Sequence, residues 1–188
     1  MRLKLVSDSV SPAEKLTIVE ELLGKDENDS NLLVQAAYYS GMDGAWEKAL
    51  AHIKRFTETE GWESSSRLTG GLLEALILSR LDRPAEAGKS LEQFHDRIKD
   101  PWYRDISKCL LGNLEEKSLT EKAGRDPAYL VTGFTALGLW KEGSNQLKQA
   151  LRYYKEALGS YRDDRIEYRF AKQRIKELQA AITDKTGE

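Results

Sequence analysis

The stretch that decides the fold is residues 33–56, LVQAAYYSGMDGAWEKALAHIKRF. The apolar residues that recur in it at intervals of three and four are Leu33, Ala36, Ala37, Ala49, Ile53 and Phe56. This is the periodicity of amphipathic helices. Beyond the first few residues of the chain, no segment sustains the period-two alternation of a strand. We therefore expect two helices in this stretch and almost no sheet anywhere.

Two further segments repeat this spacing. The second set is Ala75, Ala87, Leu91 and Phe94, and the third is Phe134, Leu137, Gly138, Ala150, Tyr154 and Ala157. In each set a small residue on the first helix is followed twelve residues later by alanine on the second. Small residues let two antiparallel helices approach closely, while bulky residues fill the space between neighbouring pairs. Such self-similarity is typical of a repeat fold.

The pattern resembles the tetratricopeptide repeat (TPR) family. The resemblance implies an all-α fold, in which antiparallel helix pairs are stacked as a short right-handed superhelix with a C-terminal capping helix. The family period is roughly 34 residues. The separation from Ala49 to Ala87 is slightly longer than one period, and that from Ala87 to Ala150 is slightly shorter than two. A degenerate repeat is therefore expected between Ala87 and Ala150.

The resemblance also predicts the organisation of the chain. We expect an N-terminal tail at 1–10, a single TPR-like helical domain at 11–183 and a C-terminal tail at 184–188. Within the domain, the expected elements are clear pairs at about 30–57, 66–98 and 128–159, a degenerate pair at about 101–124, and a capping helix at about 163–182. An incomplete repeat precedes the first clear pair.

The prolines and one capping motif predict where helices begin. The 4 prolines, each placed at an expected helix start, are Pro12, Pro84, Pro101 and Pro127. Proline is tolerated in a first turn because its missing N–H would have no partner there. Ser11 and Glu14 have the spacing of a capping box, and Gly24 is expected to end the same helix in the left-handed conformation.

The charge of the chain argues against several classes of partner. A formal net charge of −2 gives no global attraction to nucleic acids or anionic lipids. The one basic segment, 162–176, is interrupted by acids spaced for intrahelical salt bridges, so we interpret it as the solvated face of the capping helix rather than a nucleic-acid site. No run of about eighteen apolar residues predicts a membrane span. The single cysteine and the absence of a visible signal peptide favour the cytoplasm.

Residues that could carry chemistry are few and scattered. His52 and His95 are the only histidines, and neither lies one turn from another metal ligand. Zinc needs three or four converging ligands, so we expect no metal and no cofactor. Cys109 has the amphipathic surroundings of a core thiol, and no nucleophile-elbow pattern surrounds Ser64, Ser65 and Ser66. The sequence therefore predicts that the chain is not an enzyme.

The function is predicted from the surface that the resemblance implies. First helices of TPR pairs line a concave groove, and the residues at these positions are Val34, Tyr38, Leu72, Leu76, Arg80, Thr135 and Leu139. This set is mostly apolar, which suits an amphipathic helix or an extended segment of a partner. The cationic clamp with which some family members hold a chaperone C-terminus is absent. We predict a non-catalytic adaptor or scaffold that binds a protein or peptide.

Alternatives remain open at this stage. The groove residues could be covered by the chain's own first helix or by a second copy. The second case describes a self-associating structural module, a homodimer formed through the groove or through an end of the solenoid. A third alternative is an enzyme whose site the sequence does not reveal, or a regulatory fragment of a larger multidomain protein, since the chain begins with half a repeat.

Overall fold

The structure is a computed structural model that describes residues 9–59 and 65–186. Within these ranges the regular elements are helices, and no strand is present, which confirms the all-helical class. The helices are α2 (Pro12–Leu23), α3 (Ser30–Met42), α4 (Trp46–Thr59), α5 (Ser65–Arg80), α6 (Pro84–Arg97), α7 (Pro101–Leu110), α8 (Glu116–Ala123), α9 (Pro127–Gly143), α10 (Leu147–Leu158) and α11 (Ile166–Thr186). Of the described helices, none is both long enough and apolar enough to cross a membrane.

Local sequence explains where the helices begin. The Ser11 side chain accepts a hydrogen bond from the Glu14 N–H, and the Glu14 carboxylate accepts one from the Ser11 N–H at 3.0 Å, which is the predicted capping box. Aspartate oxygens accept bonds from the first turn of three other helices, and these caps are Asp29, Asp100 and Asp126. All 4 prolines lie in the first turn of a helix, as predicted.

The predicted left-handed end of α2 is wrong. Gly24 has a φ of −62°, in the right-handed helical region. The amides of Lys25 and Asp26 both donate to the carbonyl of Leu22, at 3.0 and 3.3 Å. Because these bonds already satisfy a terminal carbonyl of the helix, a left-handed reversal at Gly24 is not needed.

Sequence neighbours pack side by side, and small residues lie at their contacts. α3 packs on α4, α5 on α6, and α9 on α10. Ala49, Ala87 and Ala150 are each 0% exposed, as the close approach of paired helices requires. A Cβ on Gly138 of α9 would lie 2.6 Å from the ring of Tyr154 on α10, so only glycine fits there without displacement. The spacing found in the sequence therefore marks real helix contacts.

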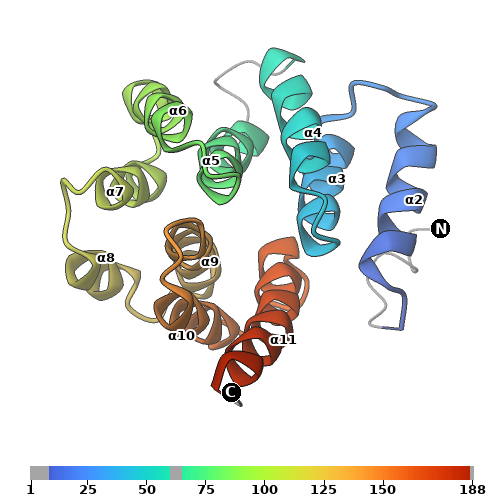
Figure 1. The fold of residues 1–188 in the computed structure, drawn as a ribbon. Helices are drawn as coiled ribbons and strands as arrows, with labels where there is room; N and C mark the ends of the chain where they lie inside the picture. Colours follow the sequence, from blue (N-terminus) through green and yellow to red (C-terminus); the bar gives the residue numbers. More distant parts are fainter. Residues whose placement is uncertain (1–8, 60–64, 187–188) are drawn as a thin grey trace.

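The described helices follow one another around a ring that closes on itself (Figure 1). From α2 the chain passes through α3 to α8, returns through α9 and α10, and ends in α11. α9 packs directly against α5 as well as α7, and α11 packs on α10 while also contacting α9 and α3. The last helix thus joins the early and late parts of the chain.

An aromatic cluster anchors α11 in this position. Phe170 of α11 is buried against Tyr38 of α3, with ring centroids 5.5 Å apart, and against Tyr154 of α10, at 6.1 Å. Trp46 of α4 completes the cluster at 6.3 Å from Phe170. Edge contacts of this kind add to the burial of a large apolar surface. One side chain of α11 therefore packs against three other helices.

Candidate functional site

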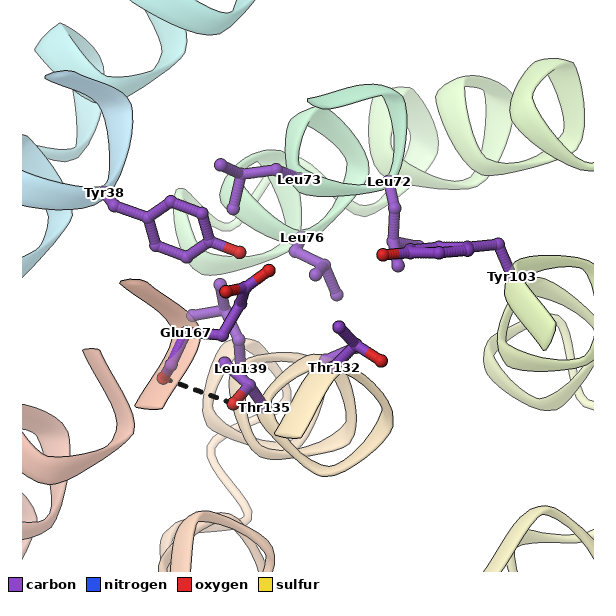
Figure 2. A pocket seen from close by; sticks show the side chains of 10 residues that line it. Tyr38, Leu72, Leu73, Leu76, Tyr103, Thr132, Thr135, Leu139 and Glu167 are labelled. Atoms are coloured by element: carbon purple, nitrogen blue, oxygen red, sulfur yellow. Dashed lines mark hydrogen bonds between the residues drawn. The ribbon is translucent and has the colours of Figure 1, made fainter. Parts of the chain in front are cut away.

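Five of the seven predicted groove residues line one cavity. They are Tyr38, Leu72, Leu76, Thr135 and Leu139. The lining is completed by Leu73, Tyr103, Thr132, Ala136 and Glu167. Figure 2 shows these side chains converging from α3, α5, α7, α9 and α11. The sequence pattern thus identified residues that are distant along the chain and adjacent in space.

The cavity is narrow, so these residues do not form a wide groove in this structure, and we call it the inner cavity. Its volume is ≈ 20 Å³, which is room for about one water molecule. None of the five predicted residues is more than 5% exposed. The physical reason is that α5 packs on α9 while α11 contacts both α3 and α9. The covering helix is the last one of the chain, and not the first, which the sequence analysis considered.

α11 is held over the cavity by polar contacts as well as by Phe170. The hydroxyl of Thr135 on α9 donates a hydrogen bond to the backbone carbonyl of Glu167 on α11, at 3.4 Å (Figure 2). The Glu167 carboxylate is buried and pairs with Arg165 at 3.1 Å. Burial, with the Glu167 charge nearby, holds the pKa of Tyr38 well above its usual value. The titratable groups of the cavity are therefore paired or neutral.

The two remaining predicted residues, Val34 and Arg80, are not among those that line this cavity. Val34 is half-buried and packs against the core. Arg80 at the end of α5 donates to the Glu142 carboxylate of α9, at 3.0 Å. The sequence analysis placed Arg80 in a groove for a partner, and the structure gives it a partner within the chain.

Glu142 is the centre of a buried ionic network. Its side chain is 1% exposed, and it accepts hydrogen bonds from Arg80, from Arg174 of α11 at 3.1 Å, and from the Tyr154 hydroxyl at 3.0 Å. Both guanidinium groups also lie over the Trp46 ring, at 5.3 and 5.7 Å. Burial and the Glu142 charge hold the pKa of Tyr154 well above its usual value. The network ties α5, α9, α10 and α11 together.

His95 and Cys109 were considered for metal binding or catalysis, and the structure shows their surroundings. His95 Nδ1 lies 2.8 Å from the Ser107 hydroxyl, which is also 2.8 Å from the carbonyl of Arg104. Burial raises the pKa of the Cys109 thiol to about 11, which leaves almost no thiolate at neutral pH.

The other residues considered for metal binding or catalysis are His52 and the serines 64–66. Nε2 of His52 on α4 lies 3.3 Å from the Glu20 carboxylate on α2, and the His52 side chain is largely buried. Across residues 9–59 and 65–186, no three side chains among histidine, cysteine, aspartate and glutamate converge as a metal site. Ser65 and Ser66 begin α5, while Ser64 lies outside the described residues.

A second cavity was not predicted from the sequence. This cleft has a volume of ≈ 240 Å³ and lies between the start of α2, the end of α3 and one face of α11. Its cationic side chains are Lys15, Arg169, Lys172 and Lys176. The other lining residues are Val10, Ser11, Pro12, Tyr39, Met42 and Gln173. We call it the basic cleft.

The sequence carried part of the signal for the basic cleft. Arg169, Lys172 and Lys176 follow the spacing of a single helix face, but they belong to the segment that we interpreted as a solvated surface. The Arg162–Asp164 ion pair, at 2.7 Å, precedes α11 and so does not belong to a face of that helix. Lys15 comes from the opposite end of the chain, and no sequence pattern connects it with α11.

Comparison with known proteins adds no assignment. No protein-family model matches the chain, and no curated protein sequence is significantly similar to it. What the fold defines directly is a class, an all-helical protein built from adjacent packed helices. Anything more specific has to be argued from the residues of this chain.

Proposed function

We propose that the chain is a non-catalytic adaptor of the TPR type, which binds a protein or peptide segment on the inner surface of α3, α5 and α9. The repeated spacing of small residues at helix contacts supports the TPR assignment. One observation carries the binding proposal: α11, a helix of the same chain, already packs on α3 and α9, two of the three helices that form this surface. A surface that buries the apolar face of one helix can accept another with a similar pattern.

The contacts of α11 indicate what such a partner must supply. Phe170 enters the aromatic cluster, Ala171 next to it is fully buried, and Leu178 extends the apolar face two turns further along the helix. Arg174, on the same side, reaches the Glu142 carboxylate. The favoured ligand is therefore an amphipathic helix with an aromatic residue and, one turn later, a cation.

The narrowness of the inner cavity supports a binding role over a catalytic one. Its lining is apolar or hydroxyl-bearing apart from Glu167, which is ion-paired. General acid–base catalysis needs a titratable group within hydrogen-bond reach of a substrate, and a space of ≈ 20 Å³ holds none. In this state a partner gains access only when α11 moves away.

The experiment supplies α11 in trans. A fluorescent peptide of residues 163–182 is titrated into the full chain and into the Phe170→Ala variant of the full chain. In the wild-type chain the tethered helix competes at an effective concentration of the order of millimolar, so little peptide binds. Truncating a buried phenylalanine costs about 3–5 kcal/mol, so the variant's own helix is readily displaced. We expect saturable binding to the variant and much weaker binding to the wild type.

A matched control separates groove binding from general destabilisation. Leu119→Ala removes a buried side chain from α8, and Leu119 does not line the inner cavity. This variant, and a peptide that itself carries Phe170→Ala, are both expected to give no saturable signal. Equal binding by the two variants, or by the two peptides, would contradict the proposal.

A second candidate is self-association by exchange of α11. The segment 159–165 joins α10 to α11, and within it Tyr161 is 85% exposed and has a φ of 53°, which is strained for a bulky residue. A strained hinge favours exchange of an identical element between two copies. Light scattering after size exclusion at two concentrations tests this, because a monomer at both, in the wild type and in Phe170→Ala, excludes exchange.

We also propose a cytoplasmic location. The support is the single cysteine, Cys109, which is a free and buried thiol. Fractionation of the native cells tests this proposal, and recovery outside the cytoplasm would contradict it.

A further inference from the structure

We propose that Glu142, Trp46 and Tyr154 form a subsite that accepts arginine in preference to lysine, and that a partner helix must bring an arginine to it. The inference rests on the proposed adaptor function, since it names what the inner surface selects in its partner. It is carried by the fit of Arg174, which the chain's own α11 already places there. We call these three side chains the arginine subsite.

Arg174 uses the shape of its guanidinium group as well as its charge. Its Nε donates to one oxygen of the Glu142 carboxylate at 3.1 Å, and its Nη2 donates to the other oxygen. The guanidinium carbon also lies over the Trp46 ring, 5.7 Å from its centroid. A planar fork that meets both carboxylate oxygens and lies over an aromatic ring is available to arginine, and not to the single ammonium of lysine.

Burial of the subsite makes this geometry decisive. The side chain of Glu142 is 1% exposed and that of Arg174 is 7% exposed. An ammonium that reaches one carboxylate oxygen leaves the other with one donor fewer, in a place where water does not replace it. The difference between arginine and lysine should therefore be larger here than in an ion pair at the surface.

Helices other than α11 hold the acceptor in place. Glu142 also accepts hydrogen bonds from Arg80 of α5 and from the Tyr154 hydroxyl of α10, each at 3.0 Å. The next residue, Gly143, lets α9 approach α5 closely, because a Cβ there would lie 2.3 Å from the hydroxyl oxygen of Ser79. We therefore expect the carboxylate to keep its orientation when α11 moves away.

The aromatic wall of the subsite is also placed without α11. A Cβ on Gly41 of α3 would lie 3.0 Å from the Trp46 ring, so the small residue makes room for the indole at the start of α4. Arg80 lies over the same ring, with its guanidinium carbon 5.3 Å from the centroid. Because α3 packs on α4, the wall belongs to the part of the chain that would receive a partner.

The charges indicate what else the partner helix must carry. Two arginines, Arg80 and Arg174, meet the carboxylates of Glu142 and Glu177. Glu177 lies on α11 itself, three residues after Arg174, so it leaves with that helix. The remaining pair of Arg80 with Glu142 is neutral, and an incoming arginine is fully compensated only when its own helix supplies an acid. The partner class is therefore a helix with an aromatic residue, an arginine four residues later and an acid three residues after that.

The first test uses fluorescent peptides of residues 163–182 and the Phe170→Ala variant of the full chain. The peptides are the parent sequence, Arg174→Lys, Arg174→Gln and Glu177→Gln. We expect Arg174→Lys to bind about tenfold or more weakly than the parent, because charge-assisted hydrogen bonds are lost, and Arg174→Gln to bind at least as weakly. The Glu177→Gln peptide should also bind more weakly than the parent. Binding of the Arg174→Lys peptide within about twofold of the parent overturns the proposal.

A second measurement examines the same preference in the intact chain, without a peptide. Hydrogen exchange of the α11 amides is compared in the wild type, Arg174→Lys and Arg83→Lys. Arg83 is a matched control, since it also meets both oxygens of a carboxylate, that of Glu86, but the Glu86 side chain is 53% exposed. We expect protection of α11 to fall about tenfold or more in Arg174→Lys and to stay within about twofold in Arg83→Lys. Equal protection in Arg174→Lys and the wild type overturns the arginine preference.

The two measurements separate this proposal from the adaptor function. If the parent peptide does not bind to the Phe170→Ala variant, the adaptor function fails together with the claim about a partner, and exchange in the intact chain judges the subsite itself. If the parent and Arg174→Lys peptides bind equally well, the adaptor function stands and the arginine subsite is refuted. Circular dichroism of each variant checks that its helical content is kept.

Discussion

Replacing Glu142 by glutamine is expected to destabilise the fold strongly, although the side chain keeps its shape. Glu142 is the only carboxylate that the structure places between Arg80 and Arg174, and it also accepts the Tyr154 hydroxyl. Glutamine removes the charge and one of two acceptor oxygens. Arg174, whose side chain is 7% exposed, then loses its buried counter-ion and keeps the ion pair with Glu177, which is 36% exposed.

The magnitude follows from the burial of each partner. Breaking a buried ion pair by removing one side costs about 3–5 kcal/mol when the other charge is left uncompensated. Because Arg174 keeps its ion pair with Glu177, we expect a loss toward the lower end of this range. Loss of the Arg80–Glu142 pair adds less than this to the destabilisation, because the Arg80 side chain is 35% exposed and water can solvate it. For a chain of this size each kcal/mol lowers Tm by roughly 2–4 °C, so a fall of roughly 6–20 °C is expected.

The assay is urea unfolding followed by circular dichroism, with thermal unfolding alongside. Glu156→Gln on α10 is the matched control, because it removes the same charge from an exposed position. That change is expected to stay within about 0.5 kcal/mol of the wild type. Arg174→Met, alone and combined with Glu142→Gln, completes a double-mutant cycle with an expected coupling of about 1–3 kcal/mol.

Hydrogen exchange adds a regional readout. Because Arg174 belongs to α11, the Glu142→Gln variant should lose protection first in α11, before α3 or α5. A destabilisation equal to that of Glu156→Gln, or a coupling near zero, would refute the reasoning that this network holds α11 in place.

Three further outcomes can be checked with simple measurements. In Gly143→Ala the new Cβ would lie 2.8 Å from the backbone carbonyl carbon of Ser79, so α5 and α9 must separate, and we expect a loss of about 1–3 kcal/mol or more in urea unfolding. Because burial raises the pKa of Cys109 from 9.0 to about 11, its alkylation by iodoacetamide at pH 8 should be about a hundredfold slower than that of an unfolded control in urea. Burial lowers the pKa of His52, so the unfolded state takes up a proton before the folded state as pH falls below about 6.5. The free energy of unfolding should therefore fall between about pH 7.5 and 5.5 less steeply in His52→Gln than in the wild type. Equal slopes for the two proteins would contradict this.

Helix positions were predictable because their signals are local. Proline geometry and side-chain caps act within one turn, so Pro12 and Asp126 mark helix starts whatever surrounds them. The end of α2 at Gly24 was mispredicted because glycine permits the left-handed conformation without requiring it. The amides of Lys25 and Asp26, which donate to the Leu22 carbonyl and make a left-handed Gly24 unnecessary, lie in the following turn. The sequence does not specify the conformation of that turn.

The sequence predicted which residues belong to the candidate site, but it did not predict whether they are exposed to solvent. Period and spacing identified Tyr38, Leu76 and Leu139 as inner residues of different helices, and the structure gathers them around one cavity. Whether they face solvent depends on where α11 lies. That position follows from the fit of Phe170 among three aromatic rings and of Arg174 against Glu142, which are contacts between distant segments.

By itself, the sequence of this protein determined its helical class, the starts of its helices and the apolar inner faces, because each of these depends on neighbours within about two turns. Only the tertiary structure decided that the ring closes, that α11 covers the inner surface, and that Lys15 joins Arg169 across the basic cleft. The reason is physical: closure depends on the sum of small packing and electrostatic terms between helices far apart in the chain, and no local pattern records that sum.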